Sequence, residues 1–178
     1  MDQVAFVFQN DHLFKTTVLE NVRAARPQAT EAEVLAALSA AQCDDIIAKL
    51  PAGIHTQVNT GGVFLSGGEQ QRIALARAII KDAPIIVLDE ATAFADPENE
   101  VKIQKALKHL TRNKTVIMIA HRLSTVVSAD RILVLENGKL IEEGTHDELL
   151  KKAGKYARMW KEYNQAVSWK LGIGKEVA

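Results

Sequence analysis

The sequence lacks the features that mark secreted, membrane-spanning and zinc-binding chains. Cys43 is the only cysteine among the 178 residues. An internal disulfide and a cysteine-based zinc site are therefore excluded, and a reducing compartment is indicated. No apolar run approaches the roughly 20 residues needed to span a bilayer, and the N-terminus carries no basic-then-apolar signal peptide. These absences predict a soluble, cytosolic chain.

An excess of charge of either sign is also missing. Lysine plus arginine and aspartate plus glutamate number 22 each, so bulk electrostatics give no reason to expect a nucleic-acid partner. A length of 178 residues suffices for one sizeable core, and we expect one domain with room for two lobes. Cys43 itself is expected to be a small buried apolar residue.

The chain is organised around the octapeptide LSGGEQQR, residues 65–72. Ser66 and Glu69 have the spacing of a capping box, which predicts a helix start, and the helix should continue to about Ile80. Gly67 and Gly68 lie in its first turn and lack a Cβ, so backbone N–H groups there can approach an anion closely. The alternative is an ordinary capped helix with an accidental glycine pair.

A second group of polar residues follows a predicted core strand. Residues 85–88 are apolar throughout, as expected for a parallel strand covered on both faces. Asp89 and Glu90 come directly after it, at the end where ligands bind in open α/β sheets. Acids placed there are costly unless they hold a cation or a proton. The alternative is two loop acids.

The other predicted elements follow from periodicity and turn residues. Asn137-Gly138 between two apolar runs predicts a hairpin. A helix beginning at Pro97 should turn Val101, Ile103 and Leu107 inward. Aromatic and apolar residues at helical spacing near the C-terminus predict a packing face. The remaining elements are strands over 3–8, 114–120, 130–135 and 139–142, and helices beginning near residues 17, 30, 44 and 145.

Three motifs in order resemble those of ATP-binding cassette (ABC) ATPases. They are the octapeptide 65–72, the strand and acids IIVLDE at 85–90, and IAHRLST at 119–125. They are similar to the family's signature motif, Walker B strand and H-loop, and the chain looks most like the nucleotide-binding domain of exporters. The resemblance implies an α/β fold, an incomplete P-loop NTPase (ABC ATPase) fold with a mostly parallel sheet flanked by helices and a helical subdomain.

The resemblance also divides the chain and assigns roles. It implies a core strand with the Q-loop at 1–9, a helical subdomain with the signature at 10–80, a RecA-like core at 81–150 and a C-terminal helix at 151–178. ATP and Mg²⁺ are the implied cofactors. The implied residues are Glu90 and His121 in catalysis, Gln9, Ser66, Gly67, Gly68, Glu69 and Asp96 in ATP binding, and Gln9 and Asp89 at the metal.

One family motif is missing. The sequence contains no Gly-x-x-x-x-Gly-Lys-[Ser/Thr], and its nearest string, residues 172–175, lacks the first glycine. The chain therefore resembles a domain shortened at its N-terminus, without Walker A. Because that loop supplies most of the grip on the phosphates, we expect the chain alone neither to bind nor to hydrolyse ATP.

The resemblance implies partners and leaves three hypotheses open. The implied partners are a second nucleotide-binding domain, packed head to tail, and the transmembrane domain of an exporter, which would hold the chain at the cytoplasmic face of the membrane. Lost strands would expose core surface, so self-association is expected as well. The alternative is a non-catalytic fragment or interaction module with the ABC fold. Soluble ABC proteins of DNA repair or translation rank last.

Overall fold

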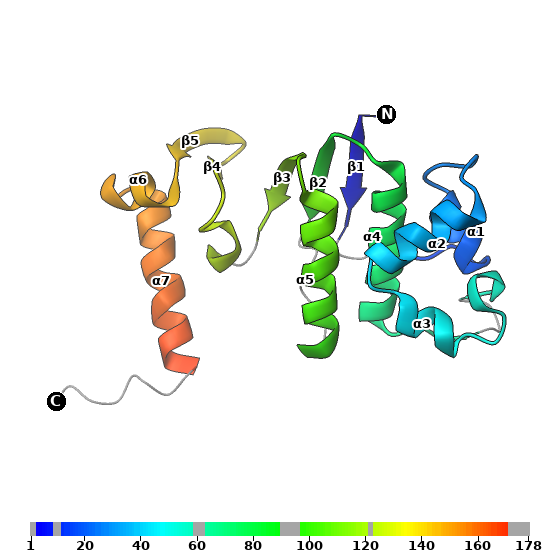
Figure 1. The fold of residues 1–178 in the computed structure, drawn as a ribbon. Coiled ribbons are helices and arrows are strands. Elements are labelled where there is room, and N and C mark those ends of the chain that lie inside the picture. The colour runs from blue at the N-terminus through cyan, green and yellow to red at the C-terminus, as the bar shows by residue number, and fades with distance from the viewer. Residues whose placement is uncertain (1–2, 9–11, 59–62, 90–96, 121–122, 171–178) are drawn as a thin grey trace. The chain divides into compact units, whose positions relative to one another are not determined.

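The computed structural model describes residues 3–8, 12–58, 63–89, 97–120 and 123–170. The chain forms two compact units, residues 1–119 and 120–178 (Figure 1).

The first unit contains a parallel sheet of three strands, β1 (Val4–Val7), β2 (Ile85–Asp89) and β3 (Thr115–Ile119), with β2 in the middle. Val7 of β1 pairs with Leu88 of β2, which pairs in turn with Met118 of β3. All three strands run in the same direction, so their carboxyl ends meet at one edge of the sheet.

The two faces of this sheet differ. On one face, Ala5, Val7, Ile86 and Leu88 are buried, in one cluster with residues of α4 (Gly67–Lys81) and α5 (Pro97–Thr111). The other face carries Phe6 and Ile117, which are 49% and 53% exposed. The expectation that β2 is covered on both faces therefore does not hold within the described residues, where alternate residues of β2 are only half-buried.

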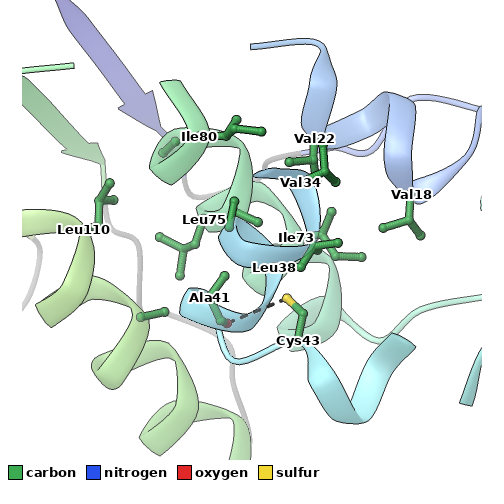
Figure 2. Packing of buried hydrophobic residues seen from close by; sticks show 14 of the residues in the cluster. Val18, Val22, Val34, Leu38, Ala41, Cys43, Ile73, Leu75, Ile80 and Leu110 are labelled. Atoms are coloured by element: carbon green, nitrogen blue, oxygen red, sulfur yellow. Dashed lines mark hydrogen bonds between the residues drawn. The ribbon is translucent and has the colours of Figure 1, made fainter. Parts of the chain in front are cut away.

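The rest of the first unit is helical, with α1 (Val18–Arg23), α2 (Glu31–Ala40), α3 (Asp44–Lys49) and the 3-10 turn η1 (Gly53–His55). Apolar residues of α1 and α2 pack with those of α4, as Figure 2 shows. Cys43 is fully buried there, as predicted. Burial raises the pKa of its thiol to about 12, so the group stays a protonated apolar side chain.

One of the residues predicted to face inward from α5 is exposed instead. Ile103 and Leu107 are buried as predicted, together with Leu110, but Val101 is 56% exposed. Successive residues of a helix are separated by about 100°, so residues two apart point to opposite sides. A buried Ile103 therefore excludes Val101 from the same stripe.

The second unit is built from η2 (Leu123–Val126), the antiparallel strands β4 (Ile132–Glu136) and β5 (Lys139–Gly144), α6 (His146–Lys151) and α7 (Lys155–Lys170). Asn137 and Gly138 have φ of 50° and 74°, values typical of the type I′ turn that joins hairpin strands. The predicted hairpin is confirmed. The core of this unit consists of Ile132, Val134, Leu149 and Tyr156.

Helix α7 packs through the first part of its predicted stripe. The ring of Trp160 meets that of His146 edge-on at 4.7 Å and stacks on Tyr163 at 5.7 Å. The Tyr163 hydroxyl donates to Ser124 Oγ at 3.0 Å. Met159 and Val167 remain about one-third exposed. Of the helices in the described ranges, none has both the length and the apolar character that crossing a membrane requires.

Candidate functional site

The first turn of α4 is a complete capping box. Ser66 has extended backbone, with φ −62° and ψ 161°, and its hydroxyl accepts from Glu69 N at 3.3 Å. Glu69 Oε2 accepts from Ser66 N at 2.8 Å. The predicted helix start is therefore confirmed at this residue. The first N–H groups of a helix have no acceptor within it, so the Gly67 and Gly68 amides are available as donors.

The loop before this turn is closed by a side chain of the helix. Gln70 Nε2 donates to Leu65 O at 2.9 Å, and Leu65 is buried. Ser66 and Gly67 are exposed, whereas Gly68 is buried against α5. The structure thus brings the four predicted signature residues together as one exposed helix end with a buried second glycine.

A buried ion pair anchors α4 one turn further on. Arg72 is 1% exposed, and its guanidinium donates to both carboxylate oxygens of Asp45 on α3, at 2.7 and 3.2 Å. It also donates to the carbonyl oxygen of Gln42. This bidentate geometry is the strong form of an Arg–carboxylate pair. Arg72 lies within the octapeptide, but no role for it was predicted from the sequence.

The same carboxylate also reaches α5. Lys102 Nζ lies 2.9 Å from Asp45 Oδ2 and 2.8 Å from Glu98 Oε1. Hydrogen bonds from the Arg72 guanidinium, and then from Lys102, hold the pKa of the Asp45 carboxyl well below its usual range. Asp45 therefore stays ionised across the physiological range and ties α3, α4 and α5 together.

A second polar contact joins α4 to the loop before α1. Asn21 is fully buried, accepts from Phe14 N at 2.7 Å and donates to the carbonyl oxygens of Phe14 and Thr17. Arg77 Nε of α4 donates to Asn21 O at 3.0 Å, and its guanidinium carbon lies 5.0 Å from the centre of the Phe14 ring. The loop is therefore clamped with Phe14 57% exposed.

Sequence reasoning missed these anchors, although each left a signal. Arg72 is a charged residue directly before the apolar run of α4, and Asn21 is a polar residue among the buried residues of α1. A long polar side chain on an apolar helix face must find buried partners. The partners themselves lie 27 residues away for Arg72 and 56 for Arg77, so periodicity does not identify them.

The second predicted group lies at the carboxyl edge of the sheet. Asp89 is the last residue of β2, is half-buried and pairs in register with Ile119 of β3. Glu90 follows it in the sequence, Gln9 comes two residues after the end of β1, and His121 comes two residues after the end of β3. Gln9, Glu90, Asp96 and His121 lie outside the described residues.

Among the described residues, the signature turn suits an anion better than the sheet edge suits a cation. A Cβ built on Gly67 meets no heavy atom within 4 Å, so there is open space beside the donors of a helix N-terminus, which favours phosphate. Within the described residues no group of three or more His, Cys, Asp or Glu side chains could hold a metal ion. Among the predicted metal-binding residues, Asp89 lies within the described ranges, and its carboxylate is the hard oxygen ligand that suits Mg²⁺.

Comparisons with known proteins agree with one another. The family profile described as ABC transporter matches residues 1–93. The ATP-dependent lipid A-core flippase of Neisseria gonorrhoeae is 52% identical over 157 residues, which are 88% of this chain and 25% of the flippase. The mycobactin import ATP-binding/permease protein IrtA of Mycolicibacterium smegmatis is 49% identical over 158 residues, which cover 89% of this chain and 18% of IrtA.

The fold is shared with a solved structure as well. A bacterial Atm1-family ABC exporter with ATP bound matches with a TM-score of 0.80 and 43% sequence identity, over 90% of this chain and 28% of that one. The chain thus spans about a quarter of the length of the flippase and of the exporter. The predicted partial ABC ATPase fold, α/β with a parallel sheet and flanking helices, is confirmed.

Proposed function

The chain belongs to the ABC transporter family, and from that premise we propose that it is the C-terminal part of an exporter's nucleotide-binding domain, which couples ATP binding and hydrolysis to transport. The observation that carries the proposal is the first turn of α4. An exposed Ser66 and an exposed Gly67 stand beside open space at a helix N-terminus whose axis is fixed by a buried ion pair. Such an end binds a phosphate group without reorganising.

In this proposal the signature turn acts on a nucleotide that a second nucleotide-binding domain holds. Ser66, Gly67, Gly68 and Glu69 form the turn, and its N–H groups and the Ser66 hydroxyl would meet the γ-phosphate. The positive end of the helix dipole at the N-terminus of α4 would favour the negative charge of the γ-phosphate. The contact would form only when two domains pack head to tail.

The carboxyl edge of the sheet would supply groups of a second site, which faces this chain's own nucleotide and is distinct from the site that its signature turn completes. Asp89 and Gln9 would hold Mg²⁺, which supplies charge neutralisation of the phosphates when it is bound. Glu90 would accept a proton from the attacking water, and His121 would donate a hydrogen bond to the γ-phosphate. Asp96 would contact ATP. The parallel order β1-β2-β3 supports this proposal, because the proposed residues follow strand ends that lie at one edge of the sheet.

We propose that the membrane partner is the transmembrane domain of an exporter. The loop before α1 supports this proposal, because it presents Phe14 to solvent while Asn21 and Arg77 clamp its backbone and ring. A rigidly held, exposed aromatic residue is a suitable contact for an apolar partner surface. The chain would then act at the cytoplasmic side of a membrane.

Titration calorimetry and ATP turnover test the proposal. Mg-ATP is titrated into the chain alone, where we expect no binding because the sequence contains no P-loop. Turnover is then measured after addition of an isolated P-loop-containing domain from a relative such as the lipid A-core flippase. We expect stimulation that is lost in Ser66→Ala.

The matched control is Thr30→Ala, which removes the equivalent cap of α2 and lies outside the signature. It should leave the stimulation unchanged. Equal stimulation by wild type and by Ser66→Ala would contradict the proposed role of the signature turn. Mg-ATP binding by the chain alone would contradict the expectation based on the missing P-loop.

The open sheet face favours a second candidate, a non-catalytic interaction module that works by association. Phe6 and Phe8 stack at 5.7 Å and are each about half exposed, as are Ile117 and Ile119. Alternate residues of a strand share a face, so these side chains form an apolar surface that a second copy could cover. Light scattering tests this candidate, because a monodisperse monomer at high concentration contradicts it.

A further inference from the structure

The two signature glycines have different surroundings, although they are adjacent in the chain. A Cβ built on Gly67 meets no heavy atom within 4 Å, whereas a Cβ built on Gly68 lies 2.8 Å from Asn99 Cγ and 2.9 Å from Asn99 Cβ. Carbon atoms in good van der Waals contact are about 3.5–4.0 Å apart. The fold itself therefore requires glycine at position 68 and does not require it at position 67.

Asn99 cannot make room for a side chain at position 68 by changing its rotamer. One of the two clashing atoms is its Cβ, which is bonded directly to the α5 backbone, so the helix would have to move. That movement is opposed one turn further along α5, where Lys102 pairs with Asp45 at 2.9 Å. Asp45 is held in turn by the buried Arg72 of α4. The first turns of α4 and α5 are thus fixed at two points.

We propose that Asn99 is a positioning residue for the signature turn. Its contact with Gly68 sets the spacing between α4 and α5, so Ser66 and Gly67 are presented at a fixed place. The packing of α4 against α5 requires glycine at position 68 whether or not a ligand is bound. At Gly67 the missing side chain instead leaves space for a ligand. The presence of a ligand at Gly67 rests on the proposed function. The packing contact between Asn99 and Gly68 is independent of it.

A size-swap cycle on the 178-residue chain tests the contact. Gly68→Ala should lower the thermal unfolding midpoint by roughly 5 °C, as overpacking of this kind does. Gly67→Ala is the matched control and should shift it by less than about 2 °C. Asn99→Gly removes both clashing atoms, so the double variant should lose clearly less than the sum of its two single shifts. Strictly additive shifts, or an unchanged midpoint in Gly68→Ala, would overturn the proposal.

A local measurement remains decisive if Gly68→Ala fails to fold. Asn99→Gly removes both the Cβ and the Cγ atom that lie against position 68. We expect faster hydrogen exchange at the amides of residues 67–69, with unchanged exchange in the first turn of α2 as the internal control. Equal exchange in the two proteins at residues 67–69 would overturn the positioning role.

Turnover with the added P-loop domain separates this inference from the proposed function. Asn99→Gly should lower kcat by roughly tenfold and leave the KM for Mg-ATP unchanged, because the other domain holds the nucleotide. Turnover equal to that of wild type would overturn the positioning role. If wild type itself gives no turnover, the proposed function fails, and the size-swap cycle and the exchange measurement still decide the inference.

Discussion

The starts of α2 and α4 use the same local device and serve different ends. Each begins with a hydroxyl residue and has glutamate three positions later, and each forms the reciprocal hydrogen bonds of a capping box. At the second helical position α2 has an exposed Ala32, whereas α4 has a buried Gly68. The cap therefore decides only where a helix starts, and the neighbouring helix decides which residue may follow.

The two helices also differ in what holds them in place. The buried residues of α2 are Val34, Ala37 and Leu38, so apolar packing fixes this helix. Helix α4 buries Arg72 as well and pairs it with Asp45. An apolar face tolerates small shifts in position, whereas a bidentate ion pair holds one geometry. The helix that carries the proposed functional turn is the one with directional anchoring.

Removal of the Arg72–Asp45 ion pair should cause the largest loss of stability. Asp45→Ala leaves the Arg72 guanidinium buried without its carboxylate, and we expect a loss of about 3 kcal/mol in the free energy of unfolding, at the lower end for such pairs because Asp45 is partly exposed. Urea unfolding measures it. The exposed neighbour is the control, since Asp44→Ala should cost far less. Equal losses in the two variants would show that the anchor adds nothing.

Removal of the cap hydroxyls of α2 and α4 should cause intermediate losses of stability that are equal in the two helices. Thr30→Ala and Ser66→Ala each delete one hydroxyl acceptor at a helix start, so each should lower the free energy of unfolding by about 1 kcal/mol. The same urea experiment gives both values. A loss at Ser66 that exceeds the loss at Thr30 by more than about 1 kcal/mol would contradict the statement that the two caps are locally equivalent.

Exchange of residues at the second helical position should destabilise both helices, although helix propensity alone predicts opposite signs for the two changes. Ala32→Gly removes an exposed methyl group from a helix and should cost about 0.5 kcal/mol through lower helix propensity. Propensity alone predicts that the reverse change, Gly68→Ala, stabilises α4, whereas the contact with Asn99 predicts destabilisation. Urea unfolding of both variants decides between them, because opposite signs would leave the packing argument without support.

The smallest expected effect is a pH dependence of the α2 cap. Hydrogen bonds from the Thr30 backbone N–H and hydroxyl lower the pKa of the Glu33 carboxyl, with a further contribution from Arg26 at 2.5 Å. A depressed carboxyl pKa stabilises the fold above the unfolded value of about 4.3 and stops doing so as pH falls through the folded value. The midpoint difference between wild type and Glu33→Gln should therefore shrink between about pH 5 and pH 3. A constant difference would contradict it.

The fold was largely predictable because its local signals agree with one another. Capping boxes marked the starts of three described helices, at Thr30, Ser66 and Thr145, and Asn137-Gly138 marked the hairpin. The error at Val101 arose because a stripe was assigned to residues two apart. The expectation for β2 failed within the described ranges for another reason, since an apolar run shows that a strand prefers burial and does not show what covers it.

The candidate site was predictable only in part. Ser66, Gly67, Gly68, Glu69 and Asp89 were chosen from motifs, and the structure places the first four on one helix turn. Gln9, Glu90, Asp96 and His121 fall outside the described residues, so their roles stay predictions. Arg72, Arg77 and Asn99 were given no role, because what each of them does depends on residues distant in the sequence.

The sequence by itself determined where the elements begin and which family the motifs resemble, because caps, turns and apolar periodicity act over a few residues. Only the tertiary structure decided which charged side chain is buried against which partner. It also decided that Gly68 is excluded from carrying a side chain while Gly67 is not. The physical reason is that these outcomes depend on distances between α3, α4 and α5, and such distances are set by packing among residues far apart in the chain.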